Sequence, residues 1–134
     1  MSVRGILGAF IIVFSEGLIL QGPSGPLHGK LGGVLQLPCS VMHPVALDEL
    51  EVEWRRVDSK ALVHLFQGGE RRPESQSYEY RDRAHFFTTA EIAKGNYSLL
   101  LYNVTVDDAG SYICSVFTKQ DSSEMTVEVE TVGE

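Results

Sequence analysis

Near its C-terminal end the chain reads Asp108-Ala109-Gly110-Ser111-Tyr112-Ile113-Cys114, and this segment indicates how the chain folds. Its cysteine and Cys39 are the two cysteines of the sequence, and the single tryptophan, Trp54, lies between them. In a sandwich of two β-sheets, a disulfide with about this spacing joins the sheets and an indole packs against it. Tyr112 can fill the core with its ring while its hydroxyl bonds to upstream backbone. The pattern predicts a two-sheet sandwich with one inter-sheet disulfide.

Apolar residues alternate with polar ones in short runs separated by turn residues, and no long helical periodicity appears. The chain is therefore predicted to be all-β. The predicted strands are 18–22, 33–40, 50–57, 61–67, 77–80, 84–89, 96–103, 111–118 and 124–132. The extra strands 61–67 and 77–80 indicate a variable-type (V-set) immunoglobulin sandwich with Greek-key connections. The segment Gly22–Pro26 is predicted to let the first strand change sheets, because proline is tolerated only at edges and bends.

Length and charge limit the functions that are open to this chain. Its 134 residues accommodate one domain and a short targeting segment. The formal net charge of −7 gives no basic stripe for a nucleic acid. We therefore expect no nucleic-acid partner, and we expect the acidic residues to serve solubility.

Residues 1–17 are predicted to be a signal peptide. Arg4 supplies a basic start, and Ile6–Phe14 supplies a short apolar run. A transmembrane anchor needs about 20 apolar residues, so a membrane span is not expected, whereas a buried strand or helix stays the alternative. Cleavage after Ser15 or after Gly17 would satisfy the preference for small residues. The V-set domain would then comprise residues 18–132.

A secretory leader implies an oxidising compartment, in which two cysteines favour one structural disulfide over a metal or redox pair. Cys39 and Cys114 have no other possible partner in this chain. The sequons Asn96-Tyr97-Ser98 and Asn103-Val104-Thr105 match the acceptor pattern for N-glycosylation. At least one of Asn96 and Asn103 is expected to carry a glycan.

Catalysis finds no support in the sequence. The two cysteines are used in the predicted disulfide, and the four histidines are scattered along the chain, at His28, His43, His64 and His85. No nucleophile with an adjacent base, no metal-binding spacing and no phosphate-binding glycine run occurs. We therefore expect no enzyme activity, no metal and no cofactor.

Strand alternation divides the side chains between a core and an outer face. The predicted core residues are Leu35, Leu37, Cys39, Val52, Trp54, Leu99, Leu101, Tyr112, Cys114 and Val116. Opposite parity predicts an outer, partner-binding face made of Glu53, Arg55, Leu62, His64, Phe66, Ile113, Ser115 and Phe117. Apolar side chains with a polar rim are typical of protein-binding surfaces. The alternatives are that loops cover this face or that a bulge shifts the parity, and His64 there would make binding depend on pH.

The chain resembles the V-set domains of the butyrophilin and myelin-oligodendrocyte-glycoprotein group, which is related to T-cell co-stimulatory ligands. The resemblance covers nearly the whole region after the leader. It rests on Val52-Glu53-Trp54-Arg55, Leu62-Val63-His64-Leu65-Phe66, Glu79-Tyr80-Arg81-Asp82-Arg83-Ala84 and the segment 108–114. Antibody and T-cell-receptor chains are disfavoured, because Ser123–Val129 lacks their Phe/Trp-Gly-x-Gly turn.

The resemblance implies a structural salt bridge between Arg83 and Asp108 across the bottom of the sandwich. It also implies an immune recognition module, which binds a protein receptor on an immune cell, expected to be a T cell, and modulates T-cell-receptor signalling and cytokine production. The binding surface would be the outer side of strands 124–132, 111–118, 50–57 and 61–67, called the G-F-C-C′ face. The alternative function is homophilic cell adhesion through the same face. The module would lie on the external side of the plasma membrane as part of a longer membrane protein, or it would be secreted.

Overall fold

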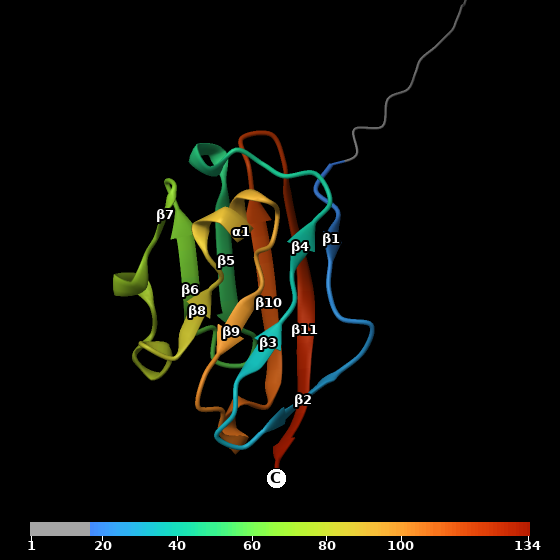
Figure 1. The fold of residues 1–134 in the computed structure, drawn as a ribbon, viewed down its shortest axis with the longest axis vertical. Coiled ribbons are helices and arrows are strands. Elements are labelled where there is room, and N and C mark those ends of the chain that lie inside the picture. Colours follow the sequence, from blue (N-terminus) through green and yellow to red (C-terminus); the bar gives the residue numbers. More distant parts are fainter. Residues whose placement is uncertain (1–16) are drawn as a thin grey trace, which may run out of the picture.

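The computed structural model describes residues 17–134, and in it two β-sheets pack face to face (Figure 1). The predicted signal peptide therefore lies outside the described residues, apart from Gly17. A disulfide between Cys39 and Cys114 joins the sheets, as the sequence predicts. The all-β, V-set-like sandwich is confirmed.

Six strands form the larger sheet, in the order β2-β11-β10-β5-β6-β7. Their bounds are Leu27–Lys30 (β2), Glu51–Arg56 (β5), Leu62–Gln67 (β6), Glu70–Arg71 (β7), Gly110–Phe117 (β10) and Ser122–Gly133 (β11). The smaller sheet has the order β3-β9-β8, with bounds Leu35–Leu37, Leu99–Leu101 and Ala84–Phe86. The short strands β1 (Leu20–Gln21) and β4 (Ser40–Val41) pair with each other.

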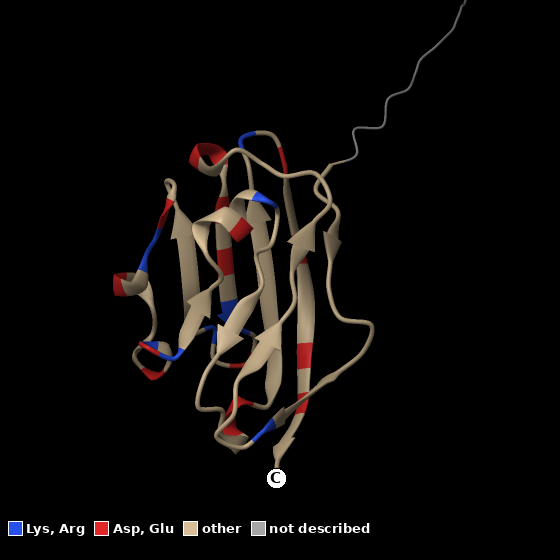
Figure 2. Ribbon diagram, viewed as in Figure 1, with Lys and Arg blue, Asp and Glu red and all other residues tan. Residues whose placement is uncertain are grey.

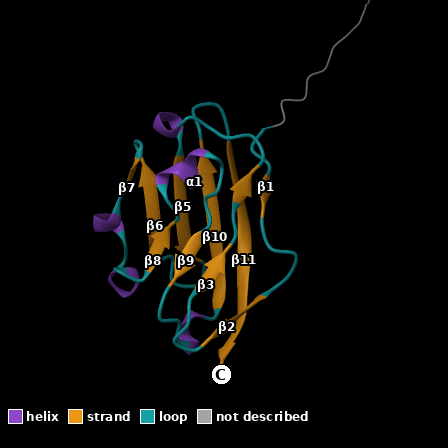
Figure 3. Cartoon of the chain, viewed as in Figure 1, coloured by secondary structure: helices purple, strands orange, loops and turns teal. Residues whose placement is uncertain are grey.

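The helical segments are short and lie at the ends of the strands or along the connection from β7 to β8 (Figure 3). They are η2 (Leu47–Glu49), η3 (Pro73–Ser75), η4 (Tyr78–Tyr80), α1 (Thr89–Ala93) and η5 (Val106–Asp108). Every strand pair is antiparallel except β2 with β11. Because β1 pairs with β4 and β2 pairs with β11, the predicted change of partner around Gly22–Pro26 is confirmed.

The core lies between the sheets and surrounds the disulfide. Cys39, Trp54, Tyr112 and Cys114 have no exposed surface, and the Trp54 indole nitrogen donates to the backbone oxygen of Tyr97 at 2.9 Å. The other predicted core residues are also buried, except Leu35, which is partly buried against the core. Burial of this much apolar surface is the main stabilising contribution to such a fold.

The structure corrects the predicted strand 77–80. This segment contains the short helix η4, and the strand that pairs with β6 is β7, seven residues earlier. The connection between β6 and β7 is a two-residue turn, in which Gly68 and Gly69 have φ values of 65° and 80°. Two positive φ angles are typical of the type I′ turn that joins hairpin strands, and glycine adopts them without steric cost.

The predicted strands 84–89 and 96–103 are longer than the observed strands β8 and β9. Helix α1 occupies part of the sequence between them, and Thr88 caps it by accepting a hydrogen bond from the Glu91 nitrogen at 3.2 Å. A threonine followed three residues later by a glutamate is a helix-start signal, which the alternation pattern overlooks.

Candidate protein-binding face

The lower end of the sandwich holds the Arg83–Asp108 ion pair that the resemblance implies. The guanidinium donates to both carboxylate oxygens of Asp108, at 3.0 and 3.1 Å. Asp108 also accepts from the Thr105 nitrogen at 2.8 Å, and its backbone oxygen accepts from the Tyr112 hydroxyl at 2.7 Å. Burial alone raises the pKa of Asp108, but the hydrogen bonds from Arg83 and Thr105 hold it below its ordinary value. This cluster connects η5, β10 and the segment before β8, so we assign it to stability of the fold.

The larger sheet presents its outer side along β11, β10, β5 and β6, which lie next to one another in that order. Residues directly opposite in an antiparallel pair point to the same side of a sheet. Starting from Glu53, the register places Ser115 and Leu65 beside it. The same rule extends to Phe117 opposite Glu51.

The G-F-C-C′ face is thus defined by the outward residues of these four strands. They are Glu51, Glu53 and Arg55 on β5; Leu62, Leu65 and Gln67 on β6; Ser111, Ile113, Ser115 and Phe117 on β10; and Ser122, Glu124, Thr126 and Glu128 on β11. Six of the eight residues predicted for this face are on it: Glu53, Arg55, Leu62, Ile113, Ser115 and Phe117. Ser115 is only 8 % exposed and adds little contact area.

The prediction is wrong for the other two residues, His64 and Phe66. They are 3 % and 1 % exposed, and they lie opposite Trp54 and Val52, which are core residues. The His64 ring packs 4.7 Å from the ring of Phe86, on the smaller sheet. Both side chains therefore point into the sandwich.

The cause of this error is a β-bulge. The register shifts between Trp54, which faces His64, and Arg55, which faces Leu62, so Val63 is an extra residue on β6. A bulge reverses the alternation from that point on. Leu65, which the sequence prediction omits, takes the outward position instead, and only the pairing with β5 reveals it.

The apolar residues of the face lie on either side of an ion pair. The Arg55 guanidinium lies 3.0 Å from the Glu53 carboxylate, and both belong to β5, the strand between β10 and β6. Leu62 and Leu65 lie on one side, whereas Ile113 and Phe117 lie on the other. Phe117 is 39 % exposed, which is high for a phenylalanine. This combination of apolar and charged groups is typical of a surface that recognises another protein.

Because His64 is buried, we no longer expect it to make binding through the face depend on pH. Burial, together with the nearby His85 and Arg71, lowers the pKa of His64 to about 4. The side chain therefore stays neutral between pH 5 and 7 in the folded chain, and it does not supply a pH switch for the face.

We instead expect His64 to make stability depend on pH. In the unfolded chain it binds a proton below its ordinary pKa of about 6.5, whereas in the folded chain it does so only near pH 4. The unfolded state holds more protons in this window, so the free energy of unfolding falls as the pH is lowered from 6.5 to 4, by up to about 3 kcal/mol. Urea unfolding at pH 7 and pH 4.5 measures this loss.

The variant His64→Phe should show a smaller loss between the two pH values, and His43→Gln, which alters an exposed histidine that does not act on His64, should behave as wild type. Equal pH dependence in wild type and His64→Phe would contradict the assignment.

The two sequons differ in their surroundings. Asn103 is exposed, in a turn with φ of 53°. The Asn96 amide nitrogen, the atom that would carry a glycan, donates to Glu91 at 3.1 Å, and Ser98 of the same sequon is 3 % exposed. We expect a glycan on Asn103 and none on Asn96, because a glycan needs solvent around the amide nitrogen.

Intact mass before and after enzymatic deglycosylation tests this expectation. Asn103→Gln should remove the mass difference and Asn96→Gln should leave it unchanged. The reverse result would contradict the assignment.

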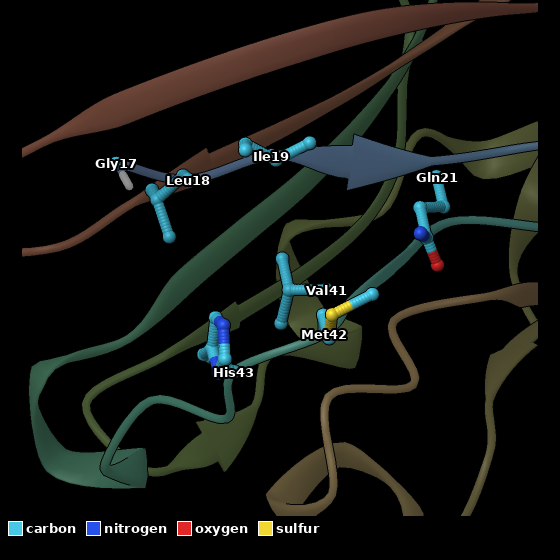
Figure 4. Close-up of a pocket in the computed structure, with 7 residues that line it drawn as sticks. All are labelled: Gly17, Leu18, Ile19, Gln21, Val41, Met42 and His43. Atoms are coloured by element: carbon cyan, nitrogen blue, oxygen red, sulfur yellow. The ribbon is translucent and has the colours of Figure 1, made fainter. Parts of the chain in front are cut away.

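A small, mostly aliphatic pocket lies between residues 17–21 and the segment around β4 (Figure 4). It is lined by Gly17, Leu18, Ile19, Gln21, Val41, Met42 and His43. Its single titratable side chain, His43, offers no paired acid and base. Among residues 17–134, no group of three or more His, Cys, Asp or Glu side chains is arranged to hold a metal ion. The helices described are all too short to cross a membrane.

Comparison with known proteins agrees with the observed architecture. The family model of the immunoglobulin V-set domain matches residues 21–131. The mouse (Mus musculus) protein "Selection and upkeep of intraepithelial T-cells protein 7" is 33 % identical over 125 residues, which cover 92 % of this chain and 31 % of the relative. Mouse "Butyrophilin subfamily 2 member A2" is 33 % identical over 109 residues, which cover 81 % of this chain and 21 % of the relative.

Among solved structures, the human B7-H4 IgV-like domain superposes with a TM-score of 0.75 at 26 % identity. The match covers 86 % of this chain and 98 % of that domain. The chain spans about a third or less of the length of these two curated relatives.

Proposed function

Because the chain belongs to the immunoglobulin V-set family, we propose that it is an extracellular recognition module that binds a protein receptor on T cells through its G-F-C-C′ face. Binding would modulate T-cell-receptor signalling and cytokine production. The predicted leader at residues 1–17 would direct the chain into the secretory pathway, so that it acts at the external side of the plasma membrane or in secreted form.

The observation that carries this proposal is the composition of the G-F-C-C′ face. It presents Leu62, Leu65, Ile113 and Phe117 to solvent on two strands of one sheet. Aromatic and aliphatic anchors that a partner can cover supply most of the binding energy in protein interfaces. Two relatives support the kind of partner: one is named for the selection and upkeep of intraepithelial T cells, and another is a butyrophilin.

The test uses fluorescent multimers of the full chain on T cells from peripheral blood and from epithelium. We expect wild type to stain a T-cell population, and we expect Ile113→Asp and Phe117→Asp to weaken staining at least about tenfold, because a buried charge would replace an apolar anchor. Val34→Asp is the matched control, since Val34 is 57 % exposed and lies just before β3 of the other sheet.

All variants should keep the wild-type thermal unfolding midpoint. The proposal is wrong if folded Ile113→Asp and Phe117→Asp multimers stain as strongly as wild type, or if wild type stains no T-cell population. A parallel measurement of cytokine release by stimulated T cells, with wild type and Phe117→Asp added in soluble form, tests the signalling part of the proposal.

A further inference from the structure

We infer that the G-F-C-C′ face recognises a partner surface whose apolar centre is surrounded by lysine and arginine, and that it does not pair with a second copy of this chain. The inference rests on the proposed function, because it specifies the partner for the same face. It is carried by the charges that the four strands place around the apolar residues.

Acidic residues outnumber basic ones on the face. Four carboxylates, those of Glu51, Glu53, Glu124 and Glu128, stand against one guanidinium, that of Arg55. Figure 2 shows acidic positions along β5 and β11, whereas β6 and β10 are free of them. Strands β11 and β5 lie on either side of β10, so Ile113 and Phe117 lie between two acidic strands.

Most of these carboxylates keep their negative charge available to a partner. Glu51 accepts a hydrogen bond from the neutral amide of Gln67 at 3.2 Å, and Glu128 accepts from the neutral hydroxyl of Ser111 at 2.6 Å. Within the face, only the negative charge of Glu53 is compensated by a positive one, because the Arg55 guanidinium lies 3.0 Å from its carboxylate. Four negative groups and one positive group leave the face with a net charge of −3.

The acidic surface continues beyond the end of the sheet. Asp48 and Glu49, from η2, line a shallow hollow together with Glu51 and Phe117. Lys119 contributes one opposite charge to that hollow. A partner that covers Phe117 would therefore meet further carboxylates at this end, and its own basic side chains would be attracted to them.

Self-pairing is disfavoured by the same charges. A two-fold dimer brings the same patch of both copies together, so two faces of charge −3 would meet. Like charges across an interface reduce affinity by about a hundredfold or more, whereas opposite charges increase the association rate and fix the orientation. Association with a basic partner should also weaken in salt, because exposed charges are screened.

The first test uses a probe of the stated chemistry, made from the chain itself. In the variant Glu51→Lys/Glu124→Lys/Glu128→Lys, the same apolar residues are surrounded by lysine, and the charge of the face changes from −3 to +3. By sedimentation at low salt, we expect wild type alone to be monomeric and an equimolar mixture of wild type and variant to form a 1:1 complex.

That complex should weaken at least about tenfold between 50 and 500 mM salt, and Ile113→Asp in the wild-type component should abolish it. A wild-type dimer that Ile113→Asp dissociates would overturn the inference, and so would a mixture that stays monomeric at low salt.

The second test separates this inference from the proposed function. T cells are stained with multimers of the neutral variant Glu51→Gln/Glu124→Gln/Glu128→Gln, beside the control Glu74→Gln/Glu79→Gln/Asp107→Asn. The control removes the same charge from exposed positions in η3, η4 and η5, outside the four strands. We expect the neutral variant to lose at least about tenfold in staining, as expected for three charge pairs at the rim of an interface, and the control to stain as wild type.

If Ile113→Asp abolishes staining while the neutral variant retains it, the face binds a receptor but the inference about charge is wrong. If Ile113→Asp retains staining, the proposed function itself is wrong.

Discussion

Removal of the disulfide by Cys39→Ala with Cys114→Ala is expected to lower the free energy of unfolding by about 4–5 kcal/mol. The two cysteines are 75 residues apart, and closing a loop of this length removes that much conformational freedom from the unfolded chain in the entropic account of disulfides. A domain of this size has a total stability of only about 5–15 kcal/mol. The double variant should therefore be largely unfolded or poorly secreted at 37 °C, which secretion yield and urea unfolding at 25 °C would measure.

Reduced wild type is the control for this variant, because it breaks the same bond without removing a sulfur atom from the core. Both cysteines have no exposed surface, so reduction is performed in denaturant and followed by refolding with the thiols blocked from reoxidation. The variant and the reduced chain should have similar unfolding midpoints. A loss below about 1 kcal/mol in both would contradict the entropic account, and would show that the rest of the core holds the sheets together without the covalent link.

Two strands of the face could be predicted from sequence because their pairing is regular. β10 pairs with β5 over six consecutive residues without a shift, so every second residue of each strand points outward as alternation predicts. Cys114, Trp54 and Tyr112 lie in this regular part of the sheet. The prediction of the core, and of Ile113 and Phe117 on the face, therefore holds.

The position of Leu65 could not be predicted in the same way. A β-bulge is defined by the partner strand, because one strand has an extra residue relative to the other. The segment Leu62–Gln67 has apolar residues at both its even and its odd positions. Either set could therefore face the core, and the sequence does not decide between them. Pairing with β5 decides that His64 and Phe66 point inward.

The β6–β7 hairpin is a different case, since its signal is local. Gly68-Gly69 is a typical two-residue hairpin turn, and a hairpin prediction there would place a strand at residues 70–71. The predicted strands 61–67 and 77–80 leave residues 68–76 as a connection, because the charged residues that follow the two glycines are not typical of a strand. The two glycines of the turn therefore predict this edge of the sheet better than the charged residues after them do.

The second large effect is expected for Asp108→Ala, which should lower the free energy of unfolding by about 3 kcal/mol. The side chain of Asp108 is 4 % exposed and that of Arg83 is 22 % exposed, so the variant leaves a largely buried guanidinium without its carboxylate. It also removes the acceptor of the Thr105 backbone nitrogen. Urea unfolding at pH 7 measures the loss, which is at the low end for a buried pair because Arg83 keeps some contact with water.

The pH dependence gives a second measurement for Asp108. Its pKa in the folded chain is below its unfolded value, so it contributes stability that is present above about pH 4 and is lost as the pH falls through the folded pKa. Wild type should therefore lose stability below pH 4, and Asp108→Ala should lack this contribution. His64 acts mainly between pH 4 and 6.5, so the two contributions occupy different windows.

The exposed pair Glu53–Arg55 provides the comparison that decides the role of Asp108. Its N–O distance of 3.0 Å equals the shorter of the two Arg83–Asp108 contacts, but 44 % of the Arg55 side chain is exposed. Glu53→Ala should cost at most about 1 kcal/mol, because water solvates the guanidinium that is left behind. If Asp108→Ala lowers the free energy of unfolding by no more than Glu53→Ala does, burial does not strengthen the Arg83–Asp108 pair. A loss about three times larger would show that two ion pairs of equal length differ in energy because of their exposure to water.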